Sequence, residues 1–436
     1  MRSHLEPVVI APQLNDVVYI ASLPSGRPRL ICVTRGRGLT AMTSDGDIIG
    51  WSDGNLVVPD RPVVPFIAGD GIGPEVWHAA RRVIDAAVEA SHGGRRRVQW
   101  LELHAGQEAV SRGLEPLPAD TIEAIRLHRV AIKGPTMTPV GRGHRSINVA
   151  LRRELDLYAS IRPVRYFEGV VAPVRNPEAF DVVVFRENTE DVYAGIEFAA
   201  GSDEARRLED LLADMGFSLP PMSGLGIKPI SRGATRRLVR AAMEYAIAHG
   251  RGRLTLVHKG NIMKHTEGAF LEWGQELVRE EFSGRPDADA VIVDDRIADA
   301  LFQDLLLRPQ HIDVLVAPNL NGDYISDACA AQVGGLGLAP GANVGEGRAL
   351  FESTHGTAPD IAGRNLANPG SMILSGAMML DHLGWSGAAS RIVGAIEEVL
   401  RSGVVTPDLQ AGRDDVRVLG TDAFAGAVIE AVRQQE

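Results

Sequence analysis

Short apolar runs alternate with longer segments of helical periodicity along most of the chain. Residues 62–67 form one such run. After a glycine-rich turn at residues 69–73, a helix-like segment opens at Pro74, with apolar positions at Val76, Ala80, Val83, Ile84 and Ala87. The same reasoning predicts a strand at residues 181–185, a helix at 231–248 stopped by Gly250, and a buried strand at 312–317 that leads into a helix. This alternation is typical of an α/β protein with a largely parallel sheet, in which functional residues gather at strand ends.

Composition narrows the class of protein further. Of the 436 residues, 45% are hydrophobic and 23% charged, as in ordinary globular proteins. The formal charge of −11 argues against a dedicated binder of nucleic acid or of an anionic membrane, so any bound anion needs a local basic cluster. Cys32 and Cys329 are too few for a disulfide framework, and no run of 18 apolar residues occurs. We expect a soluble, cytoplasmic protein.

Two carboxylates follow the predicted strand at 312–317. Asp323 and Asp327 lie in the sequence NLNGDYISD, four residues apart, and therefore share one face of the predicted helix. Hard oxygen ligands of this kind suit Mg²⁺ or Mn²⁺, which take their remaining ligands from water and substrate. The alternative is a helix-capping aspartate beside an unrelated exposed one.

Arginines form a second group of candidates. A loop rich in glycine and proline after Lys133 leads to Arg152, and Arg162 and Arg186 follow. Because guanidinium groups bind carboxylates in a bidentate fashion, three arginines suit a polycarboxylate ligand. The alternative is that each of the three is a solvated surface charge.

Two further motifs carry chemistry. Lys259 follows the apolar run 254–257, at a strand end where a lysine could transfer a proton, although a lone lysine is more often exposed and inert. Residues 352–361 form a loop of small residues that suits close approach to a flat ring or a phosphate. The turn GDGIG at 69–73 is not a true G-x-G-x-x-G and is weak evidence for dinucleotide binding.

Taken together and in this order, the motifs resemble the β-decarboxylating dehydrogenases, most closely the bacterial isocitrate dehydrogenases. The resemblance runs from about Val63 to near the C-terminus. It rests on GDGIGPE (69–75), AIKGP (131–135), RSINVALR (145–152), FREN (185–188), VHKGNIMK (257–264), NLNGDYISD (319–327) and HGTAP (355–359).

The resemblance implies an isocitrate/isopropylmalate dehydrogenase-like α/β fold that forms a homodimer with shared active sites. The large cofactor-binding domain would comprise residues 61–157 and 334–436, the small α/β domain residues 158–190 and 232–333, and the dimer clasp residues 191–231. Residues 1–60 would be an N-terminal extension of short strands, for oligomerisation or binding of a partner.

The resemblance also assigns roles to individual residues. Tyr193 would be the general acid, and Lys259 would help to remove the proton of the substrate hydroxyl. The substrate carboxylates would be held by Ser146, Asn148, Arg152, Arg162 and Arg186. Mg²⁺ or Mn²⁺ would be bound by Asp323 and Asp327, with Asp299 and Lys259 supplied to each site by the other subunit. The cofactor would be bound by Thr138, His355, Gly356, Thr357, Ala358, Asp360, Ile361 and Asn368.

The implied reaction is the oxidative decarboxylation of isocitrate to 2-oxoglutarate and CO₂, as in the tricarboxylic acid cycle. For the cofactor we expect NAD. Relatives that use NADP place lysine, tyrosine and arginine where this chain has Asp360, Ile361, Pro407 and Ala411, and a carboxylate at the ribose favours a 2′-hydroxyl over a 2′-phosphate.

Two alternatives stay open. Arg142 and His144 add positive charge where the family has a glycine-rich stretch. This change is drift on a surface loop or an adaptation to a related 3-substituted malate such as 3-(phosphonomethyl)malate. A catalytically silent homologue kept for binding or assembly would be expected to lack a metal or arginine ligand, and none is lacking.

Overall fold

The computed structural model describes residues 46–138 and 146–435, together with the backbone of three earlier strands, β1 (Leu5–Val8), β2 (Val17–Ser22) and β3 (Pro28–Val33). These three strands pair into a small antiparallel sheet. Arg142 and His144 lie outside the described residues, as does most of the chain before residue 46. None of the described helices is both long and apolar enough to cross a membrane.

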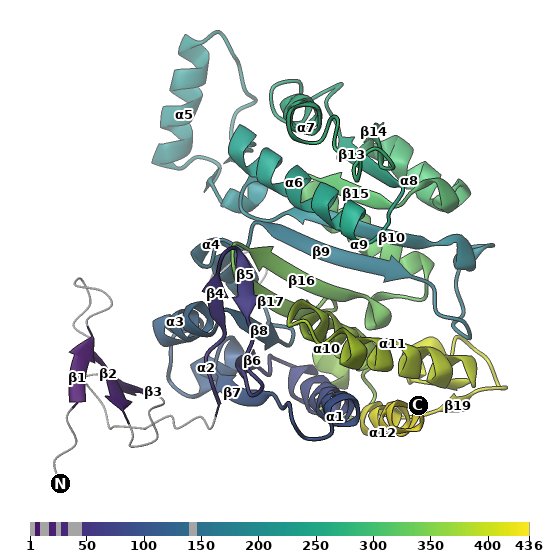
Figure 1. Cartoon of the computed structure of the whole chain (residues 1–436). Coiled ribbons are helices and arrows are strands. Elements are labelled where there is room, and N and C mark those ends of the chain that lie inside the picture. The colour runs from purple at the N-terminus through teal and green to yellow at the C-terminus, as the bar shows by residue number, and fades with distance from the viewer. Residues whose placement is uncertain (1–4, 9–16, 23–27, 34–45, 139–145, 436) are drawn as a thin grey trace.

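A ten-stranded sheet runs through the whole molecule (Figure 1). In spatial order its strands are β14 (Ile292–Ile297), β13 (Arg253–His258), β15 (Val314–Ala317), β10 (Asp181–Glu187), β9 (Ala159–Arg165), β16 (Pro340–Gly345), β17 (Arg348–Ser353), β8 (Val130–Lys133), β6 (Val63–Ile67) and β7 (Gln99–Leu103). Pairing is parallel at both ends of the sheet and antiparallel in the middle, where β9 pairs with β10 and β16, and β16 pairs with β17. The α/β class is confirmed, and the centre of the sheet departs from the parallel pattern.

Helices cover the two halves of the sheet with separate cores. Around the β6, β8 and β17 half, the largest core joins α1 (Gly73–His92), α10 (Gly370–His382), α11 (Ser386–Arg401) and α12 (Thr421–Gln434). On the opposite face of this half lie α2 (Gln107–Ser111), α3 (Ala119–His128) and α4 (Ile147–Glu154), of which α3 and α4 supply buried side chains to a smaller core. Residues from both ends of the chain therefore build one half, while the domain boundaries stay a prediction.

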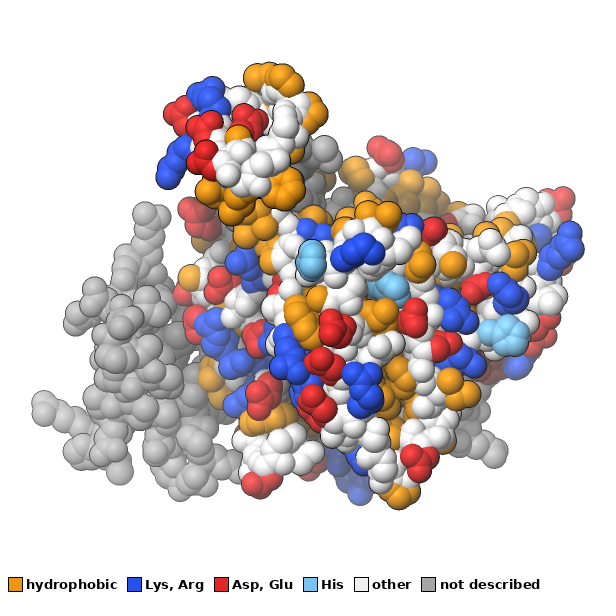
Figure 2. Space-filling view, turned by 90° about the horizontal axis from the view of Figure 1, so that it is seen from above, with side chains coloured by type: hydrophobic (Ala, Val, Ile, Leu, Met, Phe, Trp, Pro, Cys, Tyr) orange, Lys and Arg blue, Asp and Glu red, His pale blue; other side chains and the backbone are white. Residues whose placement is uncertain are grey.

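The other half of the sheet is built from the middle of the chain. One core packs α6 (Arg232–Ala248) and α7 (Glu267–Glu281) against β10, β13 and β15. The other core packs α8 (Ala298–Leu307) and α9 (Asn319–Gln332) against the opposite face. Figure 2, which looks down on the top of the view in Figure 1, shows basic and acidic side chains interspersed over this side.

Local sequence signals explain where several elements begin and end. Pro74 lies in the first turn of α1, where its missing N–H costs nothing, and Gly93 ends the helix in the left-handed conformation at φ 55°. Ser231 caps α6, accepting a hydrogen bond from the backbone N–H of Ala234 at 3.3 Å, and Gly250 follows the helix with φ 62°. The strand and helix predictions at 62–67, 181–185, 231–248 and 312–317 are confirmed to within a few residues.

Smaller elements extend from this frame. β4 (Gly50–Ser52) pairs with β5 (Asn55–Val57), β11 (Glu197–Phe198) with β12 (Leu225–Gly226), and β18 (Val404–Val405) with β19 (Arg417–Val418). Between β11 and β12, helix α5 (Asp203–Asp214) projects from the body of the molecule (Figure 1). Exposed apolar side chains follow along this segment at Leu211, Met215, Phe217, Leu219 and Met222.

Candidate active site

The three predicted arginines converge from three different elements. Arg152 lies on α4, Arg162 on β9 and Arg186 on β10, and their exposed fractions are 5%, 8% and 1%. Arginines this deeply buried are rare unless an anion neutralises them. The alternative of solvated surface charges is therefore wrong for all three.

Helix α9 supplies the anions for two of these arginines. Asp323 forms an ion pair with Arg186, and the carboxylate of Asp327 lies 3.1 Å from Nη1 of Arg162. Arg162 also lies 3.9 Å from Asp323. Both carboxylates thus point to the same side of the helix, as their four-residue spacing predicts.

Gly322 allows α9 to approach β10 this closely. A Cβ atom at Gly322 would lie 2.7 Å from the Cβ of Arg186, which no real side-chain contact tolerates. In the first turn of the helix, Asn319 Oδ1 accepts hydrogen bonds from Nε and Nη2 of Arg186 at 2.9 and 2.7 Å. The sequence NLNGD therefore fixes the guanidinium as well as presenting the carboxylates.

Burial and charge shift the titration of these groups. Burial, together with the nearby Arg152 and Arg162, lowers the pKa of Arg186 to about 10. Burial alone would raise the pKa of Asp323, but Arg186, the Tyr193 hydroxyl, Arg162 and Arg152 together outweigh it, and the pKa lies below its usual range. Burial raises the pKa of Asp327, and Arg162 opposes that rise only in part. Of the two aspartates, Asp323 therefore stays ionised to the lower pH.

Tyr193 lies against the same cluster. It sits on the 3-10 turn η2 (Asp191–Ala194), and its hydroxyl donates a hydrogen bond to Oδ2 of Asp323 at 2.6 Å. The guanidinium of Arg186 lies 4.8 Å from the centre of its ring. Burial raises the pKa of Tyr193, so the phenol keeps its proton at neutral pH. Sequence and structure agree in bringing Tyr193, Arg186 and Asp323 together.

Lys259 and Asp299 form a separate pair within the chain. The Lys259 ammonium at the end of β13 donates a hydrogen bond to Oδ1 of Asp299, in the first turn of α8, at 2.5 Å. This hydrogen bond lowers the pKa of Asp299. Among the described residues, no three His, Cys, Asp or Glu side chains gather around one point as metal ligands. A single chain therefore does not join Asp299 to Asp323 and Asp327.

The remaining predicted substrate residues lie at the start of α4. Ser146 caps the helix, and its hydroxyl accepts a hydrogen bond from the N–H of Val149 at 3.5 Å. The side-chain oxygen of Asn148 accepts a hydrogen bond from the Thr136 hydroxyl at 3.0 Å. Both side chains are partly exposed, so they remain accessible to a ligand.

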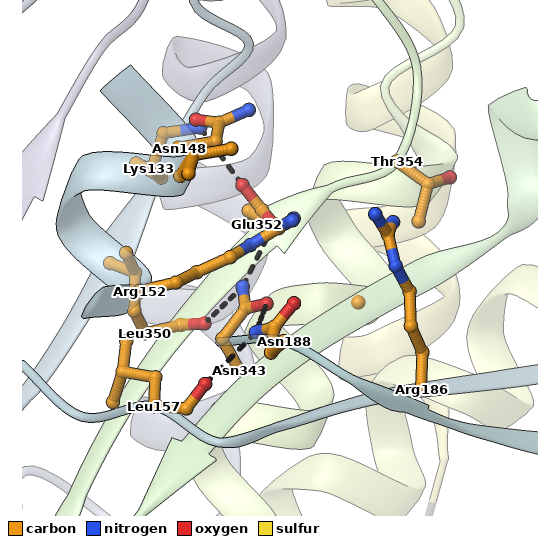
Figure 3. Close-up of polar contacts among 12 residues, drawn as sticks. Lys133, Asn148, Arg152, Leu157, Arg186, Asn188, Asn343, Leu350, Glu352 and Thr354 are labelled. Atoms are coloured by element: carbon orange, nitrogen blue, oxygen red, sulfur yellow. Dashed lines mark hydrogen bonds and ion pairs between the residues drawn. The ribbon is translucent and has the colours of Figure 1, made fainter. Parts of the chain in front are cut away.

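A buried network that sequence reasoning missed anchors Arg152 (Figure 3). Glu352, 6% exposed, lies 3.0 Å from Nζ of Lys133 and 2.8 Å from Nη2 of Arg152, and accepts a hydrogen bond from Asn343 at 2.8 Å. Asn343 in turn accepts a hydrogen bond from Asn188 at 2.9 Å. Burial would raise the pKa of Glu352, but Lys133 and Arg152 outweigh it and hold the pKa well below its usual range.

One signal in the sequence could have indicated this network. Lys133 ends the apolar strand motif AIKGP, and a lysine buried at a strand end requires a buried carboxylate. The sequence does not indicate which carboxylate pairs with Lys133, because Glu352 is 219 residues away along the chain.

The predicted cofactor loop lies against the glycine-rich turn. The carbonyl oxygen of Thr357 accepts a hydrogen bond from the N–H of Ile72 at 2.9 Å, and a Cβ at Gly71 would lie 2.0 Å from that oxygen. The buried carboxylate of Asp70 accepts a hydrogen bond from the N–H of Met137 at 2.8 Å. The turn therefore braces the loop at 134–138 and the loop at 355–361.

The cofactor candidates differ in how they are held. Burial lowers the pKa of His355, and its Nε2 has no hydrogen-bond partner in the described part of the chain. A neutral, unsatisfied imidazole suits contact with a ligand. Asn368 is buried and donates a hydrogen bond to Asp408 at 3.1 Å. The other candidates are partly or fully exposed: Thr138, Gly356, Thr357, Ala358, Asp360 and Ile361.

We predict that Glu352→Gln lowers the free energy of unfolding at pH 7 by about 3 kcal/mol, because two buried cations lose their anion. Since the pKa of Glu352 lies below its ordinary 4.5, its contribution is present above that pH and is lost as the pH falls below it. Denaturant unfolding between pH 3 and 8 measures this difference.

The matched control is Glu397→Gln, which removes a carboxylate paired with Arg165 at the surface. Its expected cost is below about 1 kcal/mol. An equal cost for the two variants, or a difference that grows as the pH falls below 4.5, would contradict the assignment.

Curated relatives cover most of this chain. It is 50% identical over 410 residues to "Isocitrate dehydrogenase [NADP]" of Staphylococcus aureus (strain N315), which covers 87% of this chain and 97% of the relative. It is 49% identical over 387 residues to the protein of the same name from Streptococcus mutans, covering 87% of this chain and 98% of the relative.

These names contradict the expectation of NAD, both as the cofactor and in the expected NAD-dependent dehydrogenase, whereas the dehydrogenase class itself is supported. The inference rested on Asp360, Ile361, Pro407 and Ala411, of which only Asp360 carries a charge. Its side chain is exposed, and Nη1 of Arg364 lies 3.4 Å from its backbone carbonyl oxygen. Dissolved ions screen an exposed charge beyond about a Debye length, so one exposed carboxylate does not by itself exclude a 2′-phosphate.

The sequence profile described as "Isocitrate/isopropylmalate dehydrogenase" matches residues 63–428. Among solved structures, the isocitrate dehydrogenase of Methylococcus capsulatus matches with a TM-score of 0.75 and 43% identity, covering 86% of this chain and 100% of that chain. The TT0538 protein of Thermus thermophilus matches with a TM-score of 0.75 and 35% identity, covering 89% of this chain and 72% of that chain. The protein belongs to the isocitrate/isopropylmalate dehydrogenase family.

Proposed function

We propose that this protein oxidises and decarboxylates isocitrate with NADP, in the presence of Mg²⁺ or Mn²⁺. The observation that carries the proposal is the convergence of buried Arg152, Arg162 and Arg186 beside the carboxylates of α9. Three arginines match the three carboxylates of isocitrate. The names of the relatives support both the substrate and the cofactor.

The residues present fit a divalent cation. Asp323 and Asp327 offer hard oxygen ligands from one face of α9, and each is held by an arginine that a substrate carboxylate could engage instead. When bound, the cation lowers the pKa of the substrate hydroxyl and stabilises negative charge on the oxygen as CO₂ leaves. A third carboxylate, Asp299, would come from a second copy of the chain, because one chain holds it apart with Lys259.

The cofactor loop fits a dinucleotide. His355 and Asn368 would hold the adenine end, and Arg364 supplies positive charge beside Asp360 for a 2′-phosphate. When bound, NADP would supply the acceptor for the hydride. Exposed apolar side chains lie on α5 at Leu211 and after it at Met215, Phe217, Leu219 and Met222. They support the proposal that residues 191–231 form a dimer clasp.

The chain's own side chains then account for binding and proton transfer. Ser146, Asn148, Arg152, Arg162 and Arg186 bind and orient the carboxylates, which places the reacting carbon against the nicotinamide. Lys259 of the second copy of the chain, once it has given up its own proton, would accept the proton of the hydroxyl as hydride leaves. Tyr193, protonated and beside Asp323, gives its proton to the carbon from which CO₂ has departed.

The direct test is steady-state kinetics of the purified full-length protein with isocitrate, measured by absorbance of the reduced cofactor. We expect kcat/KM at least about tenfold higher with NADP than with NAD. Chelation of divalent ions should abolish turnover, and Mg²⁺ or Mn²⁺ should restore it. A higher kcat/KM with NAD, preference for another 3-substituted malate, or turnover that survives chelation would contradict the proposal.

Tyr193→Phe tests the assignment of the proton donor. Loss of the phenolic proton should lower kcat by about 10²-fold or more, while KM for isocitrate changes little because the arginines remain. The matched control is Tyr166→Phe, because the Tyr166 hydroxyl donates its hydrogen bond to the carbonyl of Val170 and not to the arginine and aspartate cluster. A kcat within twofold of the wild-type value would show that another group donates the proton.

A further inference from the structure

Lys228 lies between two buried carboxylates, in the segment that joins β12 to α6. Its Nζ is 2.9 Å from Oδ1 of Asp191 and 2.8 Å from Oε1 of Glu267. Asp191 and Glu267 are 1% and 0% exposed. We call these three residues the Lys228 bridge. None of the three is among the proposed binding or proton-transferring residues.

The Asp191 end of the bridge fixes the turn that carries Tyr193. Asp191 has a left-handed backbone at φ 67°, which a residue other than glycine adopts only when its surroundings hold it there. Its Oδ1 accepts a hydrogen bond from the N–H of Val192 at 2.7 Å, and its Oδ2 accepts one from the N–H of Leu320 at 3.0 Å. The carboxylate thus ties the Tyr193 turn to the first turn of α9, the helix of Asp323.

The Glu267 end fixes the strand end that carries Lys259. Its Oε2 accepts hydrogen bonds from the backbone N–H of Lys259 and from the side chain of Asn321, the latter at 2.8 Å. Its Oε1 has no hydrogen-bond partner within the described residues other than the nearby ammonium of Lys228. Lys228 therefore holds Oε1, while the Lys259 amide and Asn321 hold Oε2.

Lysine is rare in this chain, which is consistent with a requirement for its compact ammonium at position 228. Only four of its 45 cationic residues are lysines. Three of these four, Lys133, Lys228 and Lys259, form ion pairs with carboxylates. A compact ammonium fits between two converging carboxylates, whereas the planar guanidinium of arginine is larger and presents its donors in a fixed fork.

The positive charge of Lys228 attracts both carboxylates of the bridge. Burial alone would lower the pKa of Lys228, but Glu267 and Asp191 outweigh it and raise the pKa, so the ammonium stays charged. Without it, two buried carboxylates would face each other with no cation between them. Repulsion between two uncompensated buried charges would drive the carboxylates apart. Because Asp191 holds the amides of Val192 and Leu320, and Glu267 holds that of Lys259, these backbone segments would move with them.

We propose that Lys228 is a positioning residue for the reaction. Through Asp191 it fixes the turn of Tyr193 against the start of α9, and through Glu267 it fixes the strand end of Lys259, which would serve the site of the second subunit. The proposal rests on the proposed function only in calling Tyr193 and Lys259 the proton-transferring groups. Lys228 itself touches neither substrate nor cofactor.

The test compares Lys228→Met with the matched control Arg232→Met. Arg232 lies at the start of α6 and pairs with Glu276 in an exposed ion pair, so both variants remove one cation from the same region. Lys228→Met should lower kcat for isocitrate by about 10-fold to 100-fold with KM changed less than about threefold, because misplaced proton-transfer groups slow the chemistry more than binding. Arg232→Met should leave both constants unchanged.

Amide hydrogen exchange gives a readout that needs no substrate. The amides of Val192, Lys259 and Leu320, which the bridge carboxylates hold, should exchange faster in Lys228→Met than in the wild type, while those of the α6 core keep their protection. If the wild-type protein fails to oxidise isocitrate, the proposed function is wrong. The hydrogen-exchange comparison still tests whether Lys228 holds the two backbone segments, because it needs no substrate. Uniform loss of protection with an unchanged kcat per folded molecule would overturn the proposal.

Glu267→Gln covers the case in which Lys228→Met does not fold. This variant keeps the shape of the side chain and leaves Lys228 paired with Asp191, so it places less strain on folding. It should speed exchange at the Lys259 amide, leave Val192 and Leu320 protected, and lower kcat by about threefold to tenfold. A folded Glu267→Gln protein with wild-type kcat and exchange would overturn the proposal.

Discussion

A buried guanidinium needs an anion, and that requirement organises the centre of this molecule. Arg152, Arg162 and Arg186 are almost fully removed from water, and each meets a carboxylate: Glu352, Asp327 and Asp323 respectively. The cost of leaving any one of them unpaired would be a large fraction of the stability of an ordinary domain. The elements that supply the anions, β17 and α9, are therefore held against β9, β10 and α4.

The three pairs are not equivalent. Glu352 is shared by Lys133, Arg152 and Asn343 inside the protein, and nothing else competes for it. Asp323 and Asp327 are more exposed, at 31% and 52% of their side chains. In the proposed reaction these two aspartates would bind the metal while Arg162 and Arg186 bind the substrate carboxylates. Each charge would then exchange one partner of opposite sign for another.

Much of this could be predicted from the sequence. The spacing of Asp323 and Asp327 placed both on one helical face, and the strand-end motifs placed Lys259 and Arg186 where the structure has them. These predictions depend on local periodicity, which a sequence records directly. The expectation of a parallel sheet was right at both ends and not at the centre, because an antiparallel pairing such as that of β9 with β16 depends on segments far apart in the chain.

What the sequence did not reveal has the same origin. The Glu352 network joins residues about 200 positions apart, and the Lys228 bridge joins three separate segments, so neither follows from any local pattern. The cofactor prediction failed for a different reason. It inferred specificity from Asp360, Ile361, Pro407 and Ala411, whereas the difference in affinity between two dinucleotides is a sum over every charge near the ribose. Arg364, beside Asp360, was left out of that sum.

In the proposed reaction, this exchange of partners between arginines and aspartates would make metal and substrate binding interdependent. The most direct measurement is calorimetric titration of the full-length protein with Mn²⁺, with and without saturating isocitrate. If substrate carboxylates release Asp323 and Asp327 from their arginines, isocitrate lowers the Kd of Mn²⁺ by about tenfold or more, and Mn²⁺ lowers the Kd of isocitrate by the same factor. Equal affinity for Mn²⁺ in both titrations would contradict the account.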